Sequence, residues 1–295
     1  MVYYLAFLRK ALLCVGYPFV NLKLILFRFD CRKLWMSSLQ FCSLSRWFWL
    51  LFSRDIFGYC VLLVLTKGKS VPFAALAEFQ KELDRYVPLR SAGSSSFQEY
   101  GDKFILEYEF ESDQAREMFF NQAVIIATWH HSHPALEFAL NKQLKSLVHF
   151  QKKKVAVFNS VSVGASPALV VAQAKRYLRA GKSVRLGIDG RFGQLSESVD
   201  LFGGRLKIAS GVAMLSDVAQ VPVLLASAYS DPEDPARVSI SVTGPYSKDN
   251  YQANANFLQS LLSQLSSSLM QRKVVLFSVA FLDYVVRSEE FSIEV

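Results

Sequence analysis

The chain of 295 residues is long enough to bury the core of one large α/β domain, alone or with an appendage. Its hydrophobic content of 52% and its formal net charge of +8 are unusual for a freely soluble enzyme and indicate contact with a membrane surface. Basic charge also suits nucleic acid, but the aromatic residues lie in apolar runs and not in the patterns of base-stacking modules. We therefore expect no nucleic-acid partner.

A hydrophobic, basic segment occupies residues 1–66. Its charged residues are Arg9, Lys10, Lys23, Arg28, Arg32, Lys33, Arg46 and Arg54 against Asp30 and Asp55. The basic residues interrupt each apolar run before the roughly twenty residues that a spanning helix needs. We therefore predict a helical, monotopic membrane-association segment. All four cysteines lie in it at spacings that match neither a zinc knuckle nor a CxxC pair, as expected of thiols in a reducing compartment.

Residues 67–295 predict an α/β domain. It opens with an amphipathic helix at 73–86 and a flexible Ser/Gly-rich connector at 90–96, and strand and helix patterns then alternate. The predicted strands are 103–110, 123–128, 146–150, 183–188, 221–229 and 237–244, and the predicted helices are 134–145, 167–181, 208–219 and 251–271. This alternation predicts a mixed, largely parallel sheet flanked by helices.

Polar residues follow two of the predicted strands. The stretch "TWHHSHPALEF", residues 128–138, contains three of the four histidines and Glu137, and "DGRFG", with Asp189 and Arg191, follows the strand 183–188. Ligands of parallel sheets gather at the carboxyl ends of the strands, where the chain turns into the next helix. We therefore expect the two loops to face one cleft.

The histidine cluster allows three interpretations. As a metal site it would use His130, His131, His133 and Glu137, but the remaining histidine, His149, lies in an apolar strand, and we expect no metal. As a plain helix start it explains Pro134 at the first helical position and Glu137 near the positive end of the dipole, but not three histidines.

The third interpretation is catalytic. A histidine at the strand end can hydrogen-bond to Glu137, which fixes its tautomer while the other ring nitrogen takes a proton. No serine or cysteine nucleophile elbow lies nearby, so the base would activate a hydroxyl of the substrate itself. Acyl transfer from a thioester to an alcohol is chemistry of this kind.

The order of strand, His, Asp or Glu opening a helix, and a later strand ending in an Asp turn resembles the lysophospholipid acyltransferase superfamily. Over about residues 100–245 the chain is most similar to the lauroyl/myristoyl acyltransferases of lipid A biosynthesis. The matching positions are Lys182, Asp189, Phe202, Gly203, Gly211, Val221 and Pro222.

The resemblance implies a fatty acyl group moved from an acyl carrier protein or coenzyme A thioester to a hydroxyl of a lipid or glycolipid acceptor. It implies no metal and no organic cofactor. The enzyme would be peripheral or monotopic on the cytoplasmic face of the inner membrane. Asp189 and Arg191 would either stabilise a turn or line the substrate pocket, and Gly203 and Gly204 would permit a tight turn near the cleft.

The chain departs from the family's spacing at the critical point. The family places four residues between its His and its acid, whereas His131 has five before Glu137 and His133 has three. Either His131 is the base in a loop with one extra residue, or His133 pairs with Glu137. A catalytically degenerate protein that binds lipid or a partner is the alternative function, and a metal-dependent hydrolase is the third.

Overall fold

The computed structural model describes a defined part of the chain, to which all structural statements below refer. The described residues are 81, 84–86, 89, 94–129, 134–144, 147–151, 160–162, 167–188, 196–201, 204–231, 234, 236–271 and 292–293. The predicted membrane-association segment, 1–66, lies outside them, and so does most of the predicted helix 73–86.

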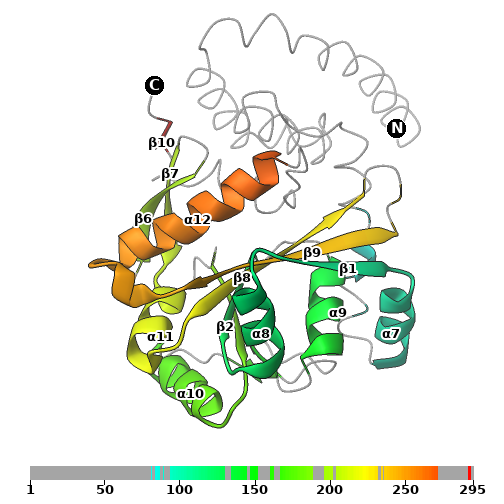
Figure 1. Cartoon of the computed structure of the whole chain (residues 1–295), viewed down its shortest axis with the longest axis horizontal. Helices are drawn as coiled ribbons and strands as arrows, with labels where there is room; N and C mark the ends of the chain where they lie inside the picture. Colours follow the sequence, from blue (N-terminus) through cyan, green and yellow to red (C-terminus); the bar gives the residue numbers. More distant parts are fainter. Residues whose placement is uncertain are drawn as a thin grey trace, which may run out of the picture. The chain divides into compact units, whose positions relative to one another are not determined.

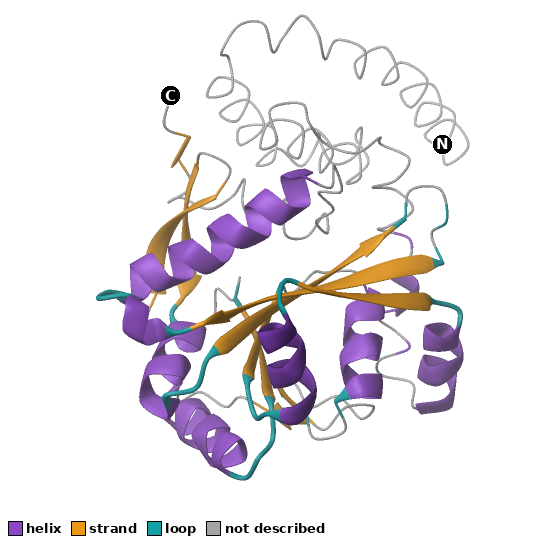
Figure 2. Cartoon of the chain, in the orientation of Figure 1, coloured by secondary structure: helices purple, strands orange, loops and turns teal. Residues whose placement is uncertain are grey.

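A seven-stranded sheet forms the centre of the fold (Figures 1 and 2). In spatial order its strands are β1 (Ile105–Phe110), β9 (Arg237–Tyr246), β8 (Val223–Ser230), β2 (Ile125–Thr128), β5 (Val184–Gly187), β3 (Val148–Gln151) and β4 (Ser160–Ser162). The five strands from β8 to β4 are parallel to one another, while β9 is antiparallel to β8 and parallel to β1. The prediction of a mixed, largely parallel sheet flanked by helices is confirmed.

One face of the sheet packs on the helices α8 (Asp113–Asn121) and α9 (Pro134–Gln143), and α7 (Ser94–Asp102) packs on α9. Figure 1 shows α8 and α9 beside the strands β8 and β9. Apolar side chains of these helices and of the sheet form one buried cluster, which includes Phe97, Phe119, Leu136, Leu140, Ile126, Leu224 and Ile240. Burial of each such side chain contributes about 1.5–3 kcal/mol, so this cluster fixes α9 on the sheet.

Further helices follow along the chain. The helix α10 (Pro167–Arg179) packs on α11 (Gly211–Ala219), and both contact β5. After the short 3₁₀ helix η1 (Lys248–Asn250), the long helix α12 (Asn254–Gln271) buries Phe257, Leu258, Leu261 and Leu262. Among the described residues, no helix has the length and apolar character that crossing a membrane requires.

A separate three-stranded sheet has the order β10 (Ser292–Ile293), β7 (Gly204–Ala209), β6 (Ser196–Leu201), with β10 antiparallel to β7. The chain divides into two compact units, and the larger comprises Lys81–Val199 and Lys207–Leu265. Asp200–Leu206 belong to the other unit. The predicted domain boundary at residue 66 stays a prediction, because it lies outside the described residues.

Some elements differ from the sequence predictions. Residues 94–96 do not belong to a flexible connector: they begin α7, because Phe97 and Tyr100, three residues apart, bury their rings in the apolar cluster. The predictions also lack α8, whose N-cap Ser112 accepts a hydrogen bond of 3.1 Å from the backbone N–H of Ala115. Tertiary packing and a local cap here outweigh weak helical propensity.

The segment before α11 was also misassigned. A helix is predicted from residue 208, but β7 extends to Ala209, and α11 begins at Gly211. The strands β4, β6 and β7 have no predicted counterpart, because β4 is only three residues long and the alternation in β6 and β7 covers only a few residues. The predicted end of α10 at Gly181 is confirmed: Gly181 has φ +74°, a left-handed conformation that glycine adopts without strain.

Candidate functional site

The helix α9 places Glu137 directly behind the histidine-rich segment. Strand β2 ends at Thr128, and α9 begins at Pro134, the first helical position that the sequence predicts. Glu137 therefore lies in the first turn, and Asn141, four residues later, lies on the same face of the helix. Glu137 is only 7% exposed, so its carboxylate needs partners inside the protein.

Two basic residues on the sheet lie beneath α9. Arg185 of β5 is the register partner of both Ile126 of β2 and His149 of β3. Because neighbours in register share a face of the sheet, and Ile126 packs in the cluster under α9, Arg185 and His149 also point toward α9. Thr128, two residues after Ile126, lies on this face as well.

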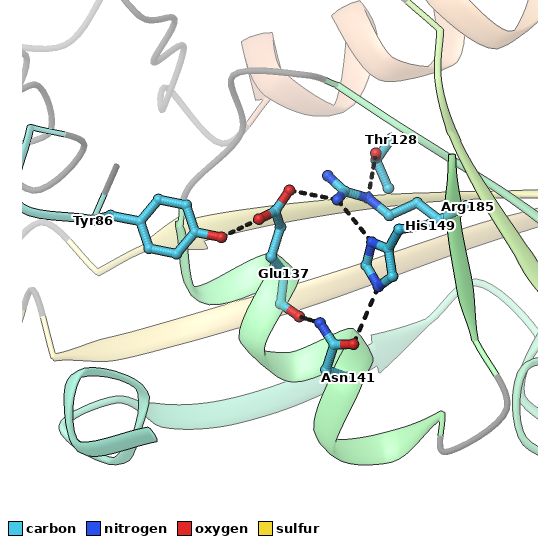
Figure 3. A network of polar contacts seen from close by, with 6 residues as sticks. All are labelled: Tyr86, Thr128, Glu137, Asn141, His149 and Arg185. Carbon is cyan, nitrogen blue, oxygen red and sulfur yellow. Dashed lines mark hydrogen bonds and ion pairs between the residues drawn. The ribbon is translucent and has the colours of Figure 1, made fainter. Parts of the chain in front are cut away.

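Arg185 is the centre of a buried network of polar contacts (Figure 3). Its Nη1 donates to Oε1 of Glu137 at 2.5 Å and lies 3.2 Å from Nδ1 of His149, and its Nε donates to Oγ1 of Thr128 at 2.9 Å. The Arg185 and Glu137 side chains are each 9% exposed, so this ion pair is largely removed from water. Charge-assisted hydrogen bonds in such surroundings are stronger than those between neutral groups.

The contacts of His149 define its tautomer. Its Nδ1 faces a guanidinium group, which can only donate, so Nδ1 carries no proton and accepts. Its Nε2 lies 3.2 Å from Oδ1 of Asn141, an acceptor, so Nε2 carries the proton. Asn141 in turn donates from Nδ2 to the backbone carbonyl of Glu137 at 2.7 Å. The chain of donors therefore runs from Arg185 through His149 and Asn141 back to Glu137.

The second carboxylate oxygen of Glu137 also has a partner. Tyr86, which is buried, donates its hydroxyl hydrogen to Oε2. The tyrosine ring is held by Phe97 and Tyr100, with centroid distances of 5.9 and 5.8 Å. The carboxylate is thus fixed in orientation at both of its oxygens.

Most of the sequence-predicted site residues lie outside the described residues. These are His131, His133, Asp189, Arg191 and Gly203. Gly204 begins β7, where it pairs with Ile293 of β10. Of the predicted catalytic residues, the described structure thus includes Glu137 alone.

The strands that carry the two polar loops lie as the sequence predicts. Strands β2 and β5 are adjacent and parallel, and Thr128 is in register with Gly187 at their carboxyl ends. The segments that follow, one beginning with Trp129 and the other with Ile188, therefore leave the sheet at the same edge. This is the edge at which parallel sheets place ligand sites.

The sequence patterns do not reveal Arg185, Thr128, Asn141 and Tyr86 around Glu137, nor a role for His149. A signal was present, because Arg185 and His149 interrupt two strands that are otherwise apolar. A basic side chain in a buried strand needs an acidic or hydrogen-bonding partner. The pairing itself cannot be read from the sequence, because Arg185 and Tyr86 lie 48 and 51 residues from Glu137 along the chain.

No group of three or more His, Cys, Asp or Glu side chains with metal-binding geometry occurs within the described part of the chain.

Next to α9, burial raises the pKa of Tyr108 to about 12, so this phenol is neutral at physiological pH. Tyr108 donates to the carbonyl of Ala139 at 3.4 Å. Tyr108 is therefore a packing residue of β1 under α9.

The chain was compared with family models, with curated proteins and with solved structures. No family model matches the chain, and no curated protein matches it either. The crystal structure of the 1-acyl-sn-glycerophosphate (LPA) acyltransferase PlsC from Thermotoga maritima is similar, with a TM-score of 0.38 and 13% sequence identity. The similarity covers 88% of this chain and 97% of that chain. At this level it carries no argument about function.

Proposed function

We propose that this protein is a membrane-associated acyltransferase. It moves a fatty acyl group from an acyl thioester, carried by acyl carrier protein or coenzyme A, to a hydroxyl of a lipid or glycolipid acceptor. His131 or His133 is the general base, and Glu137 orients it. The membrane is the inner membrane, with the protein on its cytoplasmic face.

The observation that supports this proposal most strongly is the state of Glu137. Its carboxylate is buried, held by Arg185 and Tyr86, and placed in the first turn of α9, a few residues after the histidines. An acid that orients a catalytic imidazole must itself be fixed, and Glu137 meets this requirement.

The reaction uses the base, a bound thioester and the hydroxyl of the acceptor. The imidazole takes the proton of the acceptor hydroxyl as the hydroxyl oxygen attacks the thioester carbonyl carbon. The ester C–O bond forms, the C–S bond breaks, and the imidazolium returns the proton to the departing sulfur. Glu137 stabilises the imidazolium between these two proton transfers.

Single histidine variants test the proposal. We expect His131→Ala to lower turnover by about 10²–10⁴-fold, the usual contribution of general-base catalysis, while His130→Ala, its matched control, changes turnover little. Thioester consumption with a mixture of lipid-hydroxyl acceptors measures the rate, and thermal melts check folding. The same loss in His133→Ala beside a normal His131→Ala would instead make His133 the base.

A second candidate is a catalytically degenerate protein that binds lipid or a partner without turnover. The observation that favours it is that both carboxylate oxygens of Glu137 already have protein partners, at a His-to-Glu spacing that the family does not use. Wild-type protein that consumes no thioester with any donor and acceptor, yet binds lipid, would support this candidate and overturn the first.

A further inference from the structure

The guanidinium group of Arg185 is held by more contacts than an ion pair needs. Its Nη1 contacts Glu137 and His149, while its Nε donates to Thr128, so two strands and one helix fix the orientation of one planar group. Arginine presents its donors in a rigid fork, and a group bound at two points of that fork cannot rotate. The orientation of the Glu137 carboxylate is therefore set from the sheet.

Burying this polar network has a desolvation cost that an apolar core does not have. Replacing a buried ion pair by apolar side chains of similar volume is often neutral or stabilising. Ile126, the register partner of Arg185, lies in the apolar cluster, so apolar side chains in place of both Arg185 and Glu137 would suit the fold. Stability alone therefore gives no reason for this ion pair at this place.

We propose that Arg185 is a positioning residue for the acyl transfer proposed above: it holds the Glu137 carboxylate in a fixed orientation, while Thr128 and His149 hold Arg185 and Asn141 holds His149. This inference rests on the proposed function. Arg185 touches neither substrate nor the reacting atoms, and it acts through Glu137 alone. Its removal should thus change turnover by way of Glu137 and leave substrate binding unchanged.

A double-mutant cycle between Arg185 and Glu137 tests this role. We expect Arg185→Met to lower kcat by about 10²-fold with KM unchanged, the loss that follows a shift of about 1 Å in a catalytic group. Glu137→Gln should lower kcat by a similar factor. Because both changes remove the same positioning effect, the double variant should have a kcat no lower than that of the poorer single variant.

Two further variants separate positioning from folding. The double variant carries no unpaired buried charge, so it should fold even if Arg185→Met, which leaves the carboxylate alone, is poorly stable. Arg185→Lys keeps a charge near Glu137 but cannot also bind Thr128 and His149, so we expect an intermediate kcat. Arg237→Met with Glu107→Gln is the matched control, because that ion pair of 3.5 Å is about half exposed.

Rates are measured by thioester consumption below the melting temperature of each variant. Three results would each overturn the role of Arg185 and leave the acyltransferase proposal standing. The first is a double variant in which the losses of the two single variants multiply. The others are a raised KM with normal kcat in Arg185→Met, and a wild-type kcat in Arg185→Met. Wild-type protein without turnover would overturn the proposed function, and this role with it.

Discussion

At the scale of single residues, the hydrogen bond from Tyr86 to Glu137 is the contact most open to a direct test. Tyr86→Phe removes the hydroxyl donor and keeps the ring between Phe97 and Tyr100. A hydrogen bond to a charged group contributes about 1.5–3 kcal/mol, so we expect a loss of that size in the free energy of unfolding. Urea denaturation at pH 7 measures it.

The matched control is Tyr251→Phe, whose hydroxyl lies 2.7 Å from Oγ of Ser260 in a neutral pair. Here the expected loss is smaller, about 0.5–1.5 kcal/mol. Equal losses in the two variants would mean that the charge on Glu137 adds nothing to the Tyr86 bond. If Tyr86→Phe left the free energy of unfolding unchanged, the Tyr86 hydroxyl would not be bonded to Glu137.

The sequence predicted the place of Glu137 but not its partners. Pro134 and the change from a strand to a helix pattern locate Glu137 in the first helical turn, and the structure confirms that position. The pairing with Arg185 depends on which strands become neighbours in the sheet, and one sequence contains no direct signal of that order. The unusual feature, a basic residue within an apolar strand, was present but unassigned.

At the scale of elements, the close approach of α7 to α9 depends on one glycine. A Cβ atom added at Gly101 would lie 2.0 Å from Cδ2 of Phe138, far inside van der Waals contact. We expect Gly101→Ala to destabilise the protein by about 1–3 kcal/mol, the usual penalty for overpacking a filled core. The change in thermal midpoint and a urea titration measure this loss.

Gly211→Ala is the control of opposite sign. Gly211 begins α11, and a Cβ atom there would meet nothing within 4 Å. Alanine has a better helical propensity than glycine, so this variant should be stabilised by up to about 1 kcal/mol. If Gly101→Ala were equally stabilising, α7 would not pack on Phe138 as described.

The sequence showed long elements better than short ones. The amphipathic or apolar patterns of α10, α12, β8 and β9 extend over many residues, and each was predicted within a few residues of its bounds. The helix α7 begins in a run of serines, and its stability comes from two aromatic rings buried in a distant cluster. Packing of that kind cannot be read from local propensity.

At the scale of the whole molecule, the alternation of strands and helices predicted the fold class, while the direction of β9 depends on the length of a single connection. Because β8 and β9 form a hairpin, the strands β9 and β1 run antiparallel to the other five strands of the main sheet. A connection of a few residues between two strand patterns favours such a hairpin, because a parallel crossover needs a dozen residues or more. The sequence contains only six residues between β8 and β9, and they mark the one reversal in the seven-stranded sheet.

The predicted membrane-association segment, 1–66, contributes eight basic and two acidic residues, a difference of +6 out of the chain's formal net charge of +8. We expect the full chain to bind vesicles that contain anionic lipid, and to bind neutral vesicles less. Each basic residue near an anionic surface contributes about 1 kcal/mol, so Arg9→Gln with Lys10→Gln should weaken binding by about 2 kcal/mol, or roughly 30-fold. Co-sedimentation over a range of lipid concentrations measures the affinity.

Two controls test whether charge within residues 1–66 drives binding: a rise in ionic strength, and removal of the same charge from another part of the chain. Binding that depends on charge weakens as ionic strength rises, because the Debye length shortens. Arg176→Gln with Arg179→Gln removes the same charge from the last turn of α10, far along the sequence, and should leave binding unchanged. Deletion of residues 1–66 should abolish sedimentation with vesicles of either kind. Full binding by the truncated chain would show that the α/β domain itself carries the membrane-binding surface.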